Sequence, residues 1–154
     1  KKVDGLIKSE KLKGLLDIKT YKAYAERVRK NKKQMKVMLR KLQKTKKLIG
    51  YGASAKGNTM LNYFKINLDY IVDDNPLKWG YMTPGRNIQI VSPEQIRREE
   101  KSLAIVILSW NFYNEIIKKI IMIRGDGRGD RAILYVPDVK NLPVKIDRSL
   151  KISA

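Results

Sequence analysis

The chain has 154 residues, 43% of them hydrophobic, which suits one folded domain plus an appendage. It contains no cysteine and no histidine, so disulfides, thiolate nucleophiles and Cys/His metal sites are excluded. The 34 lysines and arginines outnumber the 15 acidic residues and give a net charge of +19. Such a field attracts nucleic acid, anionic lipid or phosphorylated small molecules, unless the basic surface serves only solubility.

The N-terminal part of the chain is basic and predicted to be helical. Residues 1–19 indicate a connector with at most a helical turn, because glycines interrupt a short, charged stretch. Thr20 is a candidate N-cap for a long amphipathic helix over 20–46, whose apolar side chains recur at three- and four-residue steps. We expect this apolar stripe to pack on the body of the domain or on a neighbouring domain. Lying on a membrane or binding a calmodulin-like partner is the alternative.

The start of the chain also bears on location. No apolar run is long enough to span a bilayer, and the charged start lacks a signal-peptide pattern, so we expect a cytoplasmic protein. The start at Lys1 without a methionine indicates a fragment of a longer protein, or a processed one.

Residues 47–137 alternate between strand and helix patterns. This alternation predicts an α/β fold, a Rossmann-like doubly wound domain with a mostly parallel sheet, preceded by the long N-terminal helix. The tail over 138–154 has no clear periodicity. The predicted elements are strands at 47–52, 68–73, 88–91, 103–108 and 132–136, and helices at 55–63, from Ser92 onward, and at 112–124.

A glycine-rich turn follows the first predicted strand. Gly50-x-Gly52-x-x-Ala55 fits the dinucleotide-binding fingerprint, in which the first glycine permits a tight turn and the second lets a phosphate approach the backbone. The N–H groups and dipole at the helix start then favour an anion. The alternative is that the fold needs this turn for structural reasons alone. The predicted phosphate-binding set comprises Gly50, Gly52, Ala53, Ser54, Lys56, Gly57, Asn58 and Thr59.

Two further positions are candidates for ligand contact. Asp73 ends the second strand 23 positions after Gly50, near the spacing at which an acidic residue binds a ribose hydroxyl in NAD proteins. The alternative is a turn, since Asp-Asn-Pro is a common turn former. Trp110 and Asn111 follow a central strand, where a tryptophan could stack on a base or sugar and an asparagine could hydrogen-bond to it. Alternatively, Trp110 packs in the core and Asn111 caps the next helix.

Several blocks, in order, resemble the C-terminal domain of S-adenosylmethionine-dependent sugar C-methyltransferases, which act on nucleotide-linked deoxysugars. The resemblance covers about residues 20–137, and in its last block a serine replaces the family's proline. The blocks are residues 50–63, Val72-Asp73-Asp74-Asn75-Pro76 with Lys78 and Gly80, Thr83-Pro84-Gly85, and Leu108-Ser109-Trp110-Asn111.

The resemblance implies a division of labour. In such enzymes a zinc-binding segment and a methyltransferase domain, which holds S-adenosylmethionine and the catalytic residues, precede this domain. We therefore expect no catalytic residue, no metal site and no bound cofactor in this chain, and a nucleotide-linked sugar and the missing methyltransferase domain as its partners. The implied reaction removes a proton beside a keto group, and the resulting enolate attacks the sulfonium methyl.

Two alternatives remain open at this stage. The fingerprint and Asp73 also fit an NAD(P)-binding module or oxidoreductase, although no catalytic Tyr–Lys pair has a recognisable spacing. The net charge also fits a nucleic-acid or membrane-surface binder. However, aromatic residues are not interleaved with the basic runs as they are in single-strand binders, so we expect no specific nucleic-acid partner.

Overall fold

A computed structural model describes residues 2–126 and 128–145 of the chain. Its contacts divide the chain into two units, one up to Gln34 and one from Met35 onward. The first unit contains helix α1 (Lys2–Leu12) and most of helix α2 (Ile18–Leu42). The sequence had indicated only a connector over the residues that form α1. Within the described residues, no helix combines the length and the apolar character needed to cross a membrane.

Helix α2 begins two residues before the predicted N-cap. The Oδ1 atom of Asp17 accepts a hydrogen bond from the amide of Lys19 at 2.8 Å, which is the bond that a capping side chain makes. The hydroxyl of Thr20 instead donates to the carbonyl oxygen of Gly14 at 2.7 Å. The assignment of Thr20 as the N-cap was therefore wrong, because the carboxylate of Asp17 already satisfies the start of the helix.

The second unit is built on a six-stranded sheet in the order β3-β2-β1-β4-β5-β6. The first five strands pair in parallel and β6 pairs antiparallel with β5, which confirms the Rossmann-like, mostly parallel sheet. Strand β6 lies in the tail, where the sequence showed no clear periodicity. The strands are β1 (Lys47–Tyr51), β2 (Tyr70–Val72), β3 (Ile90–Val91), β4 (Leu103–Ile107), β5 (Arg131–Leu134) and β6 (Lys140–Pro143).

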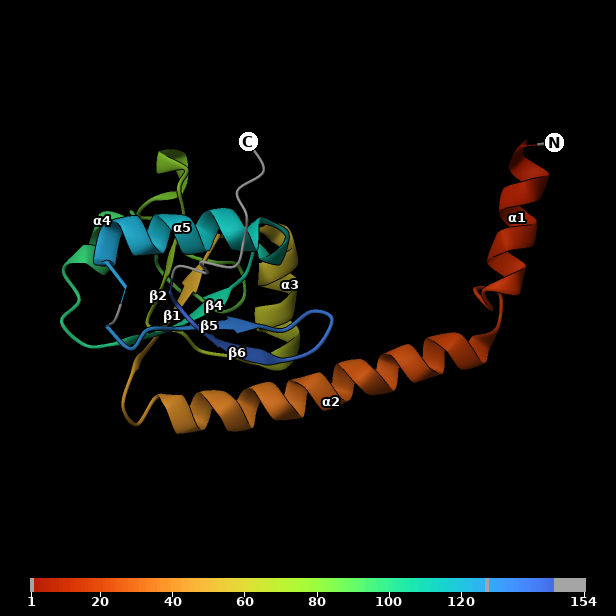
Figure 1. Cartoon of the computed structure of the whole chain (residues 1–154), viewed down its shortest axis with the longest axis horizontal. Coiled ribbons are helices and arrows are strands. Elements are labelled where there is room, and N and C mark those ends of the chain that lie inside the picture. The colour runs from red at the N-terminus through yellow and green to blue at the C-terminus, as the bar shows by residue number, and fades with distance from the viewer. Residues whose placement is uncertain (1, 127, 146–154) are drawn as a thin grey trace. The chain divides into compact units, whose positions relative to one another are not determined.

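Helices cover both faces of this sheet. Helix α3 (Ala55–Phe64) connects β1 to β2, and α5 (Tyr113–Arg124) connects β4 to β5. Because right-handed crossovers in opposite directions place their helices on opposite faces, α3 and α5 lie on different sides. Figure 1 shows the short helix α4 (Glu94–Arg97) beside α5. Two 3₁₀ turns, η1 (Pro76–Lys78) and η2 (Trp110–Phe112), follow β2 and β4.

The alternation of side chains along the central strands separates two parts of the core. Ile49 and Tyr51 of β1 belong to the same buried cluster as Ile96 of α4 and Ile116 of α5. Leu108, which follows β4, packs on the opposite face against α3. Strands β1 and β4 are neighbours, and the chain continues from β1 to α3 on one face and from β4 to α5 on the other. Their carboxyl ends therefore form the topological switch point of the sheet. Ligands of open α/β sheets bind at such a point.

Candidate ligand-binding crevice

The loops that leave β1 and β4 touch at the switch point. Gly52 has φ +90°, and its amide donates to the carbonyl oxygen of Val72 at 2.7 Å. A Cβ atom on Gly52 would lie 2.9 Å from the Cβ of Ser109 and would also collide with its hydroxyl oxygen. Only glycine fits this conformation and this approach. We call the contact between Gly52 and Ser109 the crest, because the α3 and α5 faces of the sheet meet there.

Asp73 organises the turn beside the crest. Its Oδ2 atom accepts hydrogen bonds from the amide of Ala53 at 2.7 Å and from the ammonium of Lys78 at 3.0 Å. Its Oδ1 atom accepts the amide of Asn75 at 2.9 Å. The buried carboxylate therefore ties the end of β2 to the glycine-rich turn, which supports the structural alternative for this residue. The amide of Ala53, which was expected to face a phosphate, therefore already donates its hydrogen bond to Asp73.

The start of α3 leaves two amides open. Ser54 caps this helix, since its hydroxyl oxygen accepts the amide of Gly57 at 3.2 Å and its carbonyl oxygen accepts the amide of Asn58 at 2.9 Å. Among the residues that the structure describes, the amides of Ala55 and Lys56 have no hydrogen-bond partner. Two N–H groups at the positive end of the helix dipole are therefore available to an anion.

Lys56 joins the glycine-rich turn to the segment after β4. Its ammonium lies 5.1 Å from the ring centroid of Trp110 and 3.3 Å from the amide oxygen of Asn111. Trp110 is half-buried, and Asn111 is exposed. Among the residues that the structure describes, no side chain caps η2 or α5, and their N-cap positions are Ser109 and Phe112, so the alternative that Asn111 is a helix cap is wrong. Three predicted site residues that are far apart in the sequence thus meet on the α3 side of the crest.

The remaining predicted site residues have structural contacts. Gly50 is buried against Leu108, and a Cβ atom on Gly57 would lie 2.6 Å from the Cβ of Leu108, so both glycines permit close packing. The hydroxyl of Thr59 donates to a carbonyl oxygen of its own helix. The side-chain oxygen of Asn58 accepts a hydrogen bond from Asn62 at 3.3 Å. None of these contacts directs a polar group at the crest.

Asn62 links two of the sequence blocks. Its amide nitrogen donates to the carbonyl oxygen of Pro84 at 3.0 Å, and its side chain fills the space that a Cβ atom on Gly85 would need. Gly85 has φ +79°, a conformation that favours glycine. The block that contains the glycine-rich turn and the Thr-Pro-Gly block therefore meet in the fold.

A pocket of about 370 Å³ opens on the α5 side of the crest. Sequence reasoning did not predict most of its lining. The sequence signal for this lining is the spacing i, i+3, i+4 and i+7 from Phe112. This spacing places Phe112, Glu115, Ile116 and Lys119 on one face of a helix. The pocket is lined by Tyr51, Gly52, Asp73, Asp74, Ser109, Phe112, Glu115, Ile116 and Lys119.

Tyr51, Asp74 and Lys119 form a hydrogen-bonded group in this pocket. The hydroxyl of Tyr51 donates to Oδ1 of Asp74 at 2.8 Å, and the ammonium of Lys119 lies 2.7 Å from Oδ2. Burial, together with the bond to Asp74 and the charges of Asp74 and Asp73, raises the pKa of Tyr51 well above its usual range. The phenol therefore stays protonated at neutral pH and acts as a donor. Within residues 2–126 and 128–145, no three acidic side chains gather as metal ligands.

The fold defines a Rossmann-like α/β domain, and the crevice at the switch point of its sheet is the candidate ligand site. A family model described as the C-methyltransferase C-terminal domain matches residues 1–137, and the chain belongs to this family. It is 29% identical over 116 residues to the C-methyltransferase NovU of Streptomyces niveus. This match covers 73% of the chain and 27% of NovU, so the chain spans about a quarter of that relative. The resemblance to the C-terminal domain of C-methyltransferases is confirmed.

Proposed function

We propose that this domain binds the nucleotide-linked sugar substrate of an S-adenosylmethionine-dependent C-methyltransferase and does not catalyse methyl transfer alone. One observation carries the proposal. The two open amides of α3, the ammonium of Lys56 and the side chains of Trp110 and Asn111 converge on one side of the crest. Amides at a helix start bind phosphate through hydrogen bonds and the helix dipole, and a lysine adds a mobile positive charge.

The proposal assigns the chemical step to a part of the parent enzyme outside this chain. A zinc site of cysteines and histidines does not fit the chain, which contains neither residue type. Tyr51, the phenol in the crevice, is held protonated and is a poor general base. In this proposal, the other part supplies S-adenosylmethionine, zinc and the base, in a cytoplasmic enzyme. The domain described by the structure holds and orients the substrate.

The contacts of Asp73 favour this proposal over binding of NAD. An NAD-binding domain uses the acidic residue at the end of the second strand to bind the ribose hydroxyls. Here that carboxylate accepts three hydrogen bonds from Ala53, Asn75 and Lys78. Binding of a ribose in the NAD manner would compete with the bonds that shape the turn.

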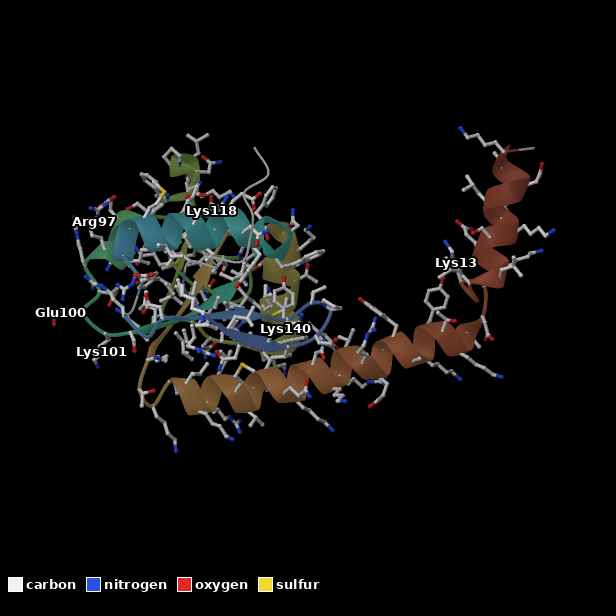
Figure 2. All side chains as sticks on the ribbon, viewed as in Figure 1. Lys13, Arg97, Glu100, Lys101, Lys118 and Lys140 are labelled. Carbon is white, nitrogen blue, oxygen red and sulfur yellow. The ribbon has the colours of Figure 1, made fainter. Side chains whose placement is uncertain are left out.

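The test is an amide NMR titration of the chain with dTDP and UDP. We expect the amide signals of Ala55 and Lys56 to move most. We also expect Lys56→Ala to weaken binding by about 10- to 100-fold, because a hydrogen bond to a charged group contributes about 1.5–3 kcal/mol. The matched control is Lys101→Ala. Figure 2 labels this exposed lysine, which precedes β4 at the opposite end of the strand. Equal affinities of the Lys56→Ala variant and the unsubstituted chain would refute the role given to this lysine.

A further inference from the structure

We propose that the pocket on the α5 side of the crest holds the sugar ring of the ligand through its hydroxyl groups, while the phosphates stay on the α3 side. This inference rests on the proposed function and adds the direction in which the ligand crosses the crest. The pocket and the group around Lys56 share the loop that follows β4. Ser109 and Phe112 line the pocket, while Trp110 and Asn111 contact Lys56.

The charge of the pocket is opposite to that of the chain. Three carboxylates, those of Asp73, Asp74 and Glu115, line it. The ammonium of Lys78 pairs with Asp73 and that of Lys119 with Asp74, so among the described residues the carboxylate of Glu115 is left without a counter-charge. The whole chain carries a net charge of +19. A phosphate in this pocket would be repelled by the unpaired carboxylate of Glu115, whereas hydroxyl groups would donate hydrogen bonds to the carboxylates. The electrostatics therefore separate a phosphate side from a hydroxyl-binding side.

Two polar groups of the pocket are available for a ligand. Among the described residues, the hydroxyl of Ser109 and the carboxylate of Glu115 have no hydrogen-bond or ion-pair partner. Asp74 accepts one hydrogen bond on each oxygen, and a carboxylate has about four lone-pair sites, so it can accept more. The pocket thus presents one donor and two acceptors that can reach different hydroxyls of one ring.

The shape and the apolar lining also fit a sugar ring. The volume of about 370 Å³ lies within the range of about 300–1,000 Å³ that is usual for small-ligand sites. Phe112 is 56% exposed, although it is a large aromatic side chain. Its ring, with Ile116 beside it in the lining, offers an apolar surface to the C–H groups of a pyranose.

The experiment compares nucleotides with their sugar conjugates on the same chain. The probes are dTDP, UDP, dTDP-glucose and UDP-glucose, and the readouts are the dissociation constants and the amide shifts of Phe112 and Glu115. The test variant is Glu115→Gln, which keeps the size of the side chain and removes its charge. The control is Glu100→Gln, an exposed acidic residue labelled in Figure 2 in the loop before β4.

We expect Glu115→Gln to weaken binding of the sugar conjugates by about 3- to 10-fold, because hydrogen bonds to a charged acceptor are about twice as strong as neutral ones. Binding of dTDP and UDP should be unaffected by Glu115→Gln. Glu100→Gln should leave the dissociation constants of all four probes unchanged. The inference is overturned if the conjugates bind no more tightly than the nucleotides. It is also overturned if Glu115→Gln tightens binding of the nucleotides, which would place the phosphates in the pocket. If no probe binds, the proposed function fails and the inference fails with it.

Discussion

The substitution Gly52→Ala tests the geometry of the crest directly. Gly52 has φ +90°, and a Cβ atom there would meet the Cβ of Ser109 at 2.9 Å and its backbone nitrogen at 3.3 Å. Rotation of the serine side chain moves its hydroxyl away but leaves its Cβ in place. Both the local conformation and the contact across the crevice therefore oppose a side chain at position 52.

The magnitude follows from these two effects. A positive φ costs an L-residue about 1–2 kcal/mol. Forcing an extra methyl group into a packed site costs about 1–3 kcal/mol. We expect Gly52→Ala to lower the free energy of unfolding by about 2–5 kcal/mol. In a Ser109→Gly background the contacts with Cβ and the hydroxyl are absent. The conformational cost of about 1–2 kcal/mol should then remain, together with the weaker 3.3 Å contact with the backbone nitrogen of residue 109.

Urea unfolding followed by far-ultraviolet circular dichroism measures both effects. The four proteins are the unsubstituted chain, the two single variants Gly52→Ala and Ser109→Gly, and the double variant, which together form a double-mutant cycle. The expected coupling energy is about 1–3 kcal/mol. If Gly52→Ala costs the same in both backgrounds, Gly52 and Ser109 do not touch and the crest is wrongly described. A cost below about 0.5 kcal/mol would also contradict the positive φ.

Two further predictions concern stability. Arg124 and Asp130 form an ion pair whose side chains are 0% and 3% exposed, so Arg124→Met should destabilise the fold by about 3–5 kcal/mol, because it leaves a buried carboxylate unpaired. Arg97→Met, which breaks an exposed pair, is the control and should cost under about 1 kcal/mol in urea unfolding. Burial raises the pKa of Tyr135 to about 12, so the unfolded chain loses this proton first, at about pH 10. The contribution of Tyr135 to the free energy of unfolding should therefore be complete below pH 10 and fall as the pH rises toward 12. A urea midpoint of unfolding that does not change over this range would contradict the burial of this phenol.

The alternation of apolar strands and helices was sufficient to predict the sheet, because buried parallel strands are continuously apolar. Strand β6 escaped prediction because Lys140–Pro143 has no alternating pattern and contains a proline. Its pairing depends on tertiary contacts, including two hydrogen bonds from Arg131 to Asn141 at 2.7 Å. Helix α1 escaped because a glycine inside a short charged segment lowers helix propensity. These elements depend on context that local patterns do not contain.

The arrangement of the candidate site was predicted in part. The glycine-rich turn, Lys56 and the Trp-Asn pair were expected at the carboxyl edge of the sheet, and the structure brings Lys56, Trp110 and Asn111 together. Sequence spacing could not show that the carboxylate of Asp73 accepts a hydrogen bond from the amide of Ala53, because that bond depends on how two loops meet. It also missed Glu115, since hydrophobic periodicity describes the buried face of α5 and says little about its polar face.

Ser109 is a departure from the family pattern that the local fold accommodates and that changes the donors beside the candidate site. The block that this segment resembles has proline here, and proline lacks an amide hydrogen and fixes φ near −65°. In this chain φ is −97°, and among the described residues the amide of Ser109 has no hydrogen-bond partner. A proline at this position would therefore remove no hydrogen bond from the turn. The serine instead adds two donors, an amide and a hydroxyl, beside the carboxylates of the pocket. Under the proposed function, these donors would be available to the ligand.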